Sequence, residues 1–183
     1  MRSNTKATLA PYTEHMAPLE DALRFGGFVL THTVWIASDL KAGELVSPIG
    51  VIEIGDSREV IPFEATSQEE AIRLGKQKMN ELTGSVDRWA FAREGLWSIL
   101  GSDSPKLDVL TVSAWSSGLD EPIILQQCFS PSSKGAFSLL KPAMILVHGV
   151  ACSKQIQSKL WPIVFQGISQ HPQGGNWSRW QSG

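Results

Sequence analysis

Residues 107–129 read LDVLTVSAWSSGLDEPIILQQCF, and this stretch decides the fold. Over 109–115 of the strand predicted at 107–116, one set of alternating positions carries leucine, valine and alanine, and the other carries valine, threonine, serine and tryptophan. A second apolar strand is expected at 122–130, after the turn residues 118–121. Because strands with two apolar faces lie in a protein interior, we predict a largely buried sheet with helices on at least one side.

Four further segments have the composition of strands. The chain contains no internal repeat and no alternation of strands with helices of the kind that is typical of parallel sheets. We therefore predict an α+β fold, in which a mainly antiparallel sheet of five or six strands packs against two helices, with a C-terminal appendage. The additional strands are predicted at 46–54, 59–65, 87–93 and 138–147.

The first two of these segments are expected to form a hairpin. The preferred register places Ile52 opposite Ile61. A shift by one residue would place Glu53 opposite Glu59, and opposed like charges destabilise a sheet, whereas the preferred register faces Glu53 with Val60. The turn then falls at 55–58, and one core face is formed by Ile52, Ile54, Ile61 and Phe63.

The first helix is predicted over 18–38. Proline suits its first turn, two acids suit the positive end of the helix dipole, and apolar residues recur at three-and-four spacing. The pair Gly26 and Gly27 weakens a helix but allows another backbone to come close. Because residues 28–36 are rich in β-branched and aromatic side chains, a strand is the alternative there.

The second helix is predicted over 67–82. The sequence TSQEE at 66–70 contains a hydroxyl followed three residues later by glutamate, which is the pattern of a capping box. The helix is expected to end near Gly84. Its apolar face is formed by Ala71, Gly75, Met79 and Leu82.

Composition divides the chain into three parts. Residues 1–16 are expected to be a flexible leader, 17–149 a single α+β domain, and 150–183 a C-terminal extension. The extension is expected to contain a short amphipathic helix over 153–168 that Pro162 kinks or breaks. The residues after it lack periodicity and are rich in Gln, Gly and Ser, so they are expected to be disordered.

Charge is divided unevenly along the chain. All 18 Asp and Glu lie at or before Glu121, which leaves the first 121 residues at −7 and the remainder at +5. This division favours self-association of unlike surfaces or an anionic partner for the basic part. Binding of an anionic polymer is the weakest of our hypotheses, and nucleic acid is not expected, because the cations are few. The cations of the C-terminal part are Lys134, Lys141, Lys154, Lys159 and Arg179.

The sequence predicts no membrane association and a cytoplasmic location. The longest weakly charged runs, 25–38 and 144–153, are shorter than the roughly 20 apolar residues that a bilayer requires. The start lacks the apolar stretch and cleavage site of a secretory signal. In a reducing compartment, Cys128 and Cys152 are expected to be free thiols.

No motif for catalysis, metal binding or nucleotide binding stands out. His148 and Cys152 are four residues apart, but the paired cysteine spacing of a zinc site is absent, and Cys128 and His171 are the other candidates. The chain has no Gly-x-Ser-x-Gly elbow and no phosphate-binding loop. We therefore predict no cofactor, no metal ligand and no catalytic residue, and we favour a protein that is not an enzyme.

Two groups of residues are candidates for binding sites. A pocket between the sheet and the first helix would make the protein a small-molecule-binding domain or an enzyme, with arginine available to hold a carboxylate or phosphate. An aromatic core face is the simpler interpretation of the strand residues. The residues predicted for this pocket are His32, Trp35, Trp89 and Arg93.

The second group lies near the C-terminus. Trp177, Arg179 and Trp180 form a cluster that could insert into a partner, because aromatic residues are enriched at interfaces. The leading functional hypothesis is a non-catalytic interaction or regulatory domain that binds a second copy of itself or another protein. It is based on the two-sided apolar strands, the uneven charge and the absence of a catalytic motif.

Overall fold

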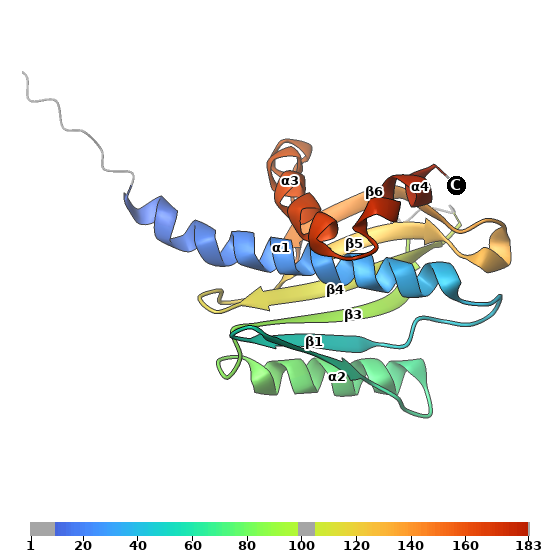
Figure 1. Ribbon diagram of the computed structural model, residues 1–183, viewed down its shortest axis with the longest axis horizontal. Coiled ribbons are helices and arrows are strands. Elements are labelled where there is room, and N and C mark those ends of the chain that lie inside the picture. The colour runs from blue at the N-terminus through green and yellow to red at the C-terminus, as the bar shows by residue number, and fades with distance from the viewer. Residues whose placement is uncertain (1–9, 99–104, 183) are drawn as a thin grey trace, which may run out of the picture.

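The computed structural model describes residues 10–98 and 105–182, with side chains from residue 16 onward. Over these residues the chain forms an α+β fold, as predicted, but with a sheet of seven strands and with four α-helices, rather than five or six strands and two helices (Figure 1). The elements are α1 (Ala10–Asp39), β1 (Ile49–Ile54), β2 (Ser57–Pro62), α2 (Gln68–Leu82), β3 (Arg88–Trp97), β4 (Leu107–Ser116), β5 (Ile123–Ser130), η1 (Ser132–Lys134), β6 (Ser138–Val147), β7 (Val150–Ala151), α3 (Lys154–Gln170), η2 (Gly174–Asn176) and α4 (Trp177–Gln181).

The sheet has the strand order β2-β1-β3-β4-β5-β6-β7, and every neighbouring pair is antiparallel. Six of the strands correspond to predicted ones. The seventh, β7, has two residues and continues the sheet beyond β6. The deciding hairpin is β4–β5, in which Val112 lies opposite Leu125.

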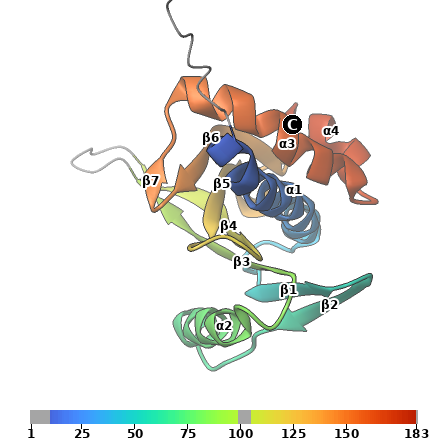
Figure 2. The same cartoon turned by 90° about the vertical axis from the view of Figure 1, so that its left-hand side faces the viewer.

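The two faces of the sheet carry different helices. Figure 2 shows α1 and α3 on one side and α2 on the other side of β1 and β3. Successive side chains along the strands point to opposite faces of the sheet. Ala90 and Val112 face the α1 side, whereas Trp89, Phe91 and Trp115 belong to a second cluster with α2. Both α1 and α2 pack on β3, so this strand is buried from both sides.

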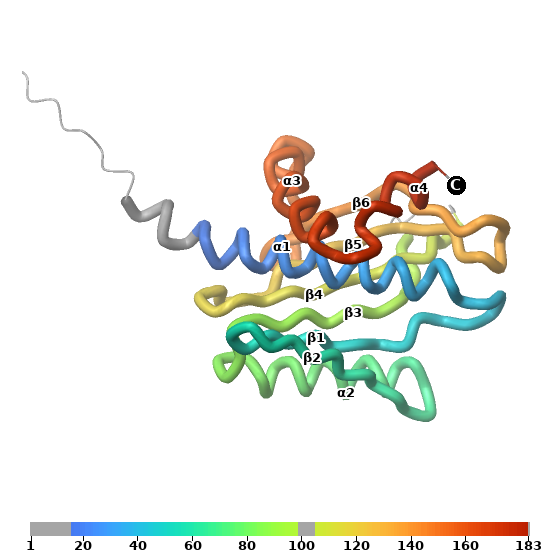
Figure 3. Tube along the Cα trace, viewed as in Figure 1, coloured from blue at the N-terminus to red at the C-terminus, as the bar shows by residue number. Residues whose placement is uncertain are grey.

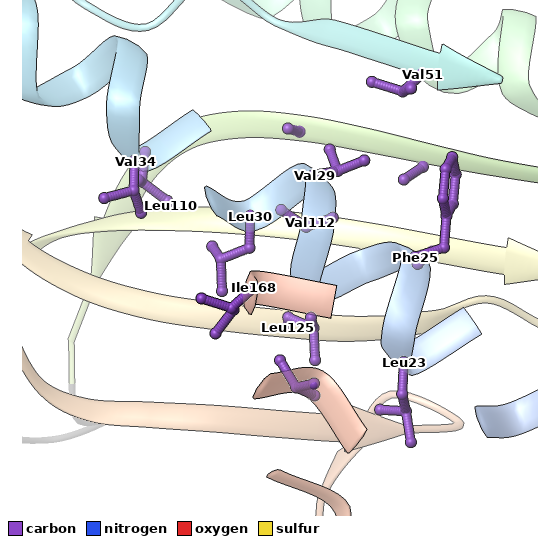
Figure 4. Packing of buried hydrophobic residues seen from close by; sticks show 14 of the residues in the cluster. Leu23, Phe25, Val29, Leu30, Val34, Val51, Leu110, Val112, Leu125 and Ile168 are labelled. Atoms are coloured by element: carbon purple, nitrogen blue, oxygen red, sulfur yellow. The ribbon is translucent and has the colours of Figure 1, made fainter. Parts of the chain in front are cut away.

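The main core lies between α1, α3 and the sheet. In Figure 4, Leu30 of α1 lies among Leu110, Val112 and Leu125 of the strands and Ile168 of α3. All five side chains are almost completely buried. Burial of one such side chain contributes about 1.5–3 kcal/mol, so this layer supplies much of the stability.

The first helix extends beyond its predicted limits. It includes all of 18–38 and begins at Ala10, so the prediction of a flexible leader is wrong for residues 10–16. The part of that prediction that concerns residues 1–9 lies outside the described residues. The strand alternative for 28–36 is wrong, because these residues are helical throughout.

Tertiary packing explains why the β-branched part of α1 is helical. Thr31 and Thr33 are completely buried, and their hydroxyls donate hydrogen bonds of 2.8 Å to the carbonyl oxygens of Gly27 and Val29, one turn earlier. The buried polar groups are thus satisfied within the helix. Packing against the sheet and α3 then outweighs the preference of β-branched residues for strands, because intrinsic propensities are small.

The hairpin β1–β2 has a different register from the predicted one. Glu53 lies opposite Arg58 instead of Val60, and the turn is shortened to residues 55–56. Gly55 has a φ of +56°, a conformation that favours glycine and tight hairpin turns. The Arg58 guanidinium donates a hydrogen bond of 2.7 Å to the Glu53 carboxylate, which favours the observed register. The shift is by two residues, so each side chain keeps its predicted face.

The helix α2 confirms the predicted second helix. The backbone N–H of Glu70 donates a hydrogen bond of 3.2 Å to Oγ of Ser67, which caps the helix. The chain leaves α2 through Gly84, whose φ is +87°. Gly75 lies against the ring of Phe91, where a Cβ would overlap the aromatic carbons. A glycine at this position therefore lets α2 approach the sheet closely.

The C-terminal part of the chain is ordered and belongs to the main core. Figure 3 shows α3, in orange and red, crossing the blue α1, although the two helices come from opposite ends of the chain, and α4 then packs on β6. The helix α3 continues through Pro162, and α4 follows it after a 3₁₀ turn. Residues 150–182 therefore do not form a separate extension, and the prediction of disorder is wrong for residues 171–182. Leu160, Val164, Ile168, Trp177 and Trp180 are buried in the core.

Candidate functional site

A pocket of about 370 Å³ lies between three segments that are far apart in the sequence. It is bounded by one face of α1, by the β1–β2 hairpin and by the turn that follows α3. This volume lies within the range of small-molecule sites. The side chains from α1 are Phe28, His32 and Trp35, those from the hairpin are Val51, Arg58 and Val60, and the turn contributes residues 171–173.

Two histidines are hydrogen-bonded to each other at the pocket wall. The backbone N–H of Gln173 donates a hydrogen bond of 3.0 Å to Nδ1 of His171, so the neutral ring carries its hydrogen on Nε2. Nε2 of His171 lies 3.2 Å from Nδ1 of His32, to which it donates. The neutral His32 ring consequently carries its hydrogen on its own Nε2.

The surroundings keep this histidine pair neutral. Burial, together with the nearby His32 and Arg58, lowers the pKa of His171 to about 4. Burial also lowers the pKa of His32. Protonation of His171 would place a hydrogen on Nδ1, against the N–H of Gln173, which is consistent with the direction of the shift. Near pH 7 the pair therefore contributes N–H donors without a charge.

Aromatic rings form the apolar walls of the pocket. The ring centroid of Phe28 lies 4.8 Å from that of His171, and the ring of Trp35 lies 5.7 Å from that of His32, both in edge-to-face arrangements. Such contacts hold the rings in defined orientations. Trp35 remains 37% exposed and Val60 47% exposed, which is high for large apolar side chains at the rim of a pocket.

Arg58 introduces a charge at one side of the pocket. Its guanidinium carbon lies 3.9 Å from the centroid of the Phe28 ring, a cation–π contact. The same group forms an ion pair of 2.7 Å with Glu53, which also pairs with Arg88 at 3.2 Å. One carboxylate therefore lies between two guanidinium groups, and the three side chains carry a net charge of about +1.

The structure does not bring the four predicted ligand-binding residues together. His32 and Trp35 line the pocket on the α1 side, whereas Trp89 and Arg93 belong to the opposite face of the sheet. Trp89 stacks on Trp115 with the ring centroids 6.4 Å apart, and it lines a smaller cavity of about 200 Å³ beside α2. Arg93 is half-buried, and burial lowers its pKa. A single pocket that contains all four residues is therefore excluded.

The predicted partner-binding cluster is also corrected. Trp177 and Trp180 are 4% and 5% exposed, so neither ring is available on the surface of this chain. Arg179 points outward from α4 between them. The sequence suggested an exposed tail because a five-residue helix has too few positions to show an apolar period.

Of the nine residues that line the pocket, only His32 and Trp35 were predicted, and the missed residues include Phe28, Arg58 and His171. Phe28 precedes His32 by four residues, so the helical period alone places the two side chains on one face. Arg58 was placed in a turn because of the different hairpin register. His171 was placed in a disordered segment, and no local signal links it to α1.

Other kinds of site are not found in the described part of the chain. No group of three or more His, Cys, Asp or Glu side chains there could hold a metal ion, so the predicted candidates Cys128, His148, Cys152 and His171 do not converge. Within residues 10–98 and 105–182, no helix combines the length and the apolar character that a membrane crossing requires.

Comparison with known proteins gives no match. The chain matches no protein-family model, no curated protein sequence and no solved structure.

Proposed function

We propose that this protein is a binding domain whose pocket between α1, the β1–β2 hairpin and residues 171–173 accepts a small, largely apolar ligand. The observation that carries the proposal is the combination of aromatic walls with a neutral, hydrogen-bonded histidine pair. Ligand sites typically combine apolar surface with a few fixed polar groups that orient the ligand. Trp35 and Val60 are the apolar side chains that a ligand would remove from water.

Binding is favoured over catalysis by the chemistry of the lining side chains. The described residues that line the pocket include no serine, cysteine or carboxylate. Nδ1 of each histidine is occupied by a hydrogen bond within the protein, so neither ring has a free basic nitrogen in this tautomer. General-base chemistry therefore lacks an available acceptor, whereas ligand orientation by an N–H donor does not require one.

The experiment uses the neutral fluorescent probe N-phenyl-1-naphthylamine, titrated into the purified protein. We expect saturable binding with an increase in fluorescence, and loss of binding in Val60→Trp, because the indole would occupy the pocket. The matched control is Val150→Trp, which changes an equally simple but more exposed valine on β7. Equal binding by wild type and Val60→Trp, or no saturable binding at all, would contradict the proposal.

Self-association is a second candidate function. Among the described elements, α2 packs on β1 and β3 but not on the same face of β5 and β6. That face carries half-buried, uncharged side chains in two cross-strand pairs, and such a surface suits the equivalent surface of a second copy around a twofold axis. The pairs are Ile124 with Leu146 and Gln126 with Met144.

Sedimentation analysis over a range of protein concentrations tests this second candidate. We expect a dimer at high micromolar concentration, and a monomer for Ile124→Lys, since a buried unpaired charge opposes association. Ile156→Lys on α3 is the control, because Ile156 is already half exposed on another surface. A wild-type protein that remains monomeric at all concentrations would remove this candidate.

A further inference from the structure

The charges around the pocket indicate which class of ligand it accepts, an inference that rests on the proposed binding function. Among the described side chains that line the pocket, only Arg58 is charged. The histidine pair is neutral near pH 7, because burial lowers the pKa of both rings. The pocket therefore combines apolar walls with one positive group at its edge.

The ion pair with Glu53 does not cancel this positive charge. Glu53 is shared with Arg88, so a single carboxylate compensates two guanidinium groups. The side chain of Glu53 is 12% exposed, whereas that of Arg58 is 39% exposed. Arg58 is thus the more accessible partner of the ion pair. Some of the N–H donors of its guanidinium group remain accessible to a ligand.

The histidine pair adds a directed hydrogen-bond donor. The N–H of Gln173 donates to Nδ1 of His171, and Nε2–H of His171 donates to Nδ1 of His32. The Nε2–H of His32 is the donor that remains at the end of this series of hydrogen bonds. His32 is partly exposed and lines the pocket, and its Nε2 is not among the buried unsatisfied atoms. A ligand oxygen can therefore receive this hydrogen.

We propose that the pocket binds a monocarboxylate with an aromatic or branched apolar body. The apolar body would lie against Phe28, Trp35 and Val60, and the carboxylate would accept hydrogen bonds from Arg58. Arginine recognises carboxylates through parallel N–H donors, which matches a planar anionic group better than a neutral one. One cation with partial compensation fits one negative charge, because a second ligand charge would lose its hydration without a partner.

The test compares two ligands of nearly the same shape, one with a carboxylate and one with a neutral amide in its place. Calorimetric titrations of the full chain are made with 1-naphthylacetate and with its neutral counterpart 1-naphthylacetamide. We expect the wild type to bind the carboxylate about tenfold more tightly, a difference of about 1.4 kcal/mol. In Arg58→Met, which keeps an apolar stem over Phe28, this preference should disappear while amide binding remains.

Two more variants make the test specific. Glu53→Gln keeps Arg58 and removes its competing anion, so the preference for the carboxylate should increase above the wild-type value. Arg73→Met is the matched control, because Arg73 is an exposed arginine of α2 that pairs with Glu70 at 2.7 Å, away from the pocket. It should leave the preference unchanged.

The possible results separate this inference from the proposed function. If wild type binds both ligands equally, or if Glu53→Gln weakens carboxylate binding, the charge assignment is wrong while the pocket remains a ligand site. If wild type binds neither of these ligands nor the neutral probe, the proposed function fails as well. Circular dichroism of each variant verifies that the fold is retained, and Glu53→Gln tests the inference even if Arg58→Met does not fold.

Discussion

Gly27 of α1 and Gly167 of α3 each lie against the backbone of the other helix. A Cβ at Gly27 would overlap the carbonyl oxygen of Val164, and a Cβ at Gly167 would overlap the carbonyl oxygen of Arg24. The two helices therefore approach more closely than helices with larger side chains at the crossing could. A side-chain hydrogen bond of 3.1 Å from Arg24 to Gln166 accompanies this contact.

We predict that Gly27→Ala and Gly167→Ala each destabilise the protein by about 3 kcal/mol. Alanine favours a helix over glycine by about 1 kcal/mol, but the new methyl group has to displace backbone atoms, and overpacking costs more than the helix gains. Urea unfolding measures the change. The control is Gly175→Ala, since no atom lies within 4 Å of a Cβ at that position. A neutral result at both crossing glycines would contradict the close approach of α1 and α3.

The histidine pair predicts how stability depends on pH. The folded-state pKa of His171, about 4, is below the value of 6.5 for an unperturbed histidine, so the unfolded state binds more protons as the pH falls. Stability should therefore be complete near pH 7 and decrease as the pH falls toward 4. For His171 alone, the free energy of unfolding should fall by about 2 kcal/mol between pH 7 and pH 5.

The variant His171→Asn isolates this contribution. The asparagine carbonyl can still accept the N–H of Gln173, as in an Asx turn, but it does not titrate. The difference in unfolding free energy between wild type and variant should therefore become smaller at pH 5 than at pH 7. Parallel curves for the two proteins would show that His171 keeps an ordinary pKa.

Glu94 predicts an opposite dependence on pH. Glu94 is 9% exposed, and its carboxylate accepts a hydrogen bond of 2.8 Å from the backbone N–H of Val46. Burial raises the pKa of Glu94 despite this hydrogen bond, and the nearby Asp108 raises it further. The folded state therefore binds this proton more tightly than the unfolded state, and the group favours folding more as the pH decreases.

We predict that Glu94→Gln stabilises the protein at pH 8, by an amount on the order of 1 kcal/mol. The amide oxygen can still accept the N–H of Val46, and no charge has to be buried. The advantage should diminish as the pH is lowered, because wild-type Glu94 then becomes neutral. Unfolding titrations at pH 5 and pH 8 provide the measurement, and a variant that is less stable at both pH values would contradict the expected pKa direction.

Trp180 should contribute strongly to stability although it lies near the end of the chain. Trp180→Ala removes a buried indole from the main core and should cost about 3–5 kcal/mol. Arg179→Ala is the matched control, because the neighbouring side chain is exposed and its loss should change the stability by less than about 0.5 kcal/mol. Thermal unfolding of both variants measures the effect. A tolerated Trp180→Ala would mean that α4 does not stabilise the fold.

Local signals in the sequence were sufficient to predict most strands and α2. The apolar pattern of β4 and β5 marks both segments as strands, and the Ser67 cap marks the start of α2, because each signal depends only on neighbouring residues. The register of β1–β2 was wrong by two residues. A shift of two keeps every side chain on its face, so the apolar pattern could not distinguish the two registers.

The C-terminal helices and half of the pocket depend on contacts that the sequence pattern does not contain. The aromatic residues of α4 are buried because the sheet and α3 enclose them, not because α4 is amphipathic by itself. His32 was predicted as a site residue because it is a histidine close to Trp35 in the first helix. Its partner His171 could not be identified, since only the fold brings the two residues together.

Because α1 and α3 lie near opposite ends of the chain, their contact can form only after most of the protein has been synthesised. Residues His32 and His171 are separated by 139 positions, and Arg24 and Gln166 by 142, so these contacts close some of the longest loops in the chain. During synthesis, α1 leaves the ribosome long before α3 has been made. The apolar side of α1 that contacts α3 therefore stays uncovered until α3 is complete. Contacts between residues so far apart slow folding, because closing a long loop costs conformational entropy before the contact forms. The pocket is complete only when α1 and residues 171–173 are both folded, so a ligand would bind only the folded protein. Its binding would stabilise the N-terminal and C-terminal helices together against unfolding.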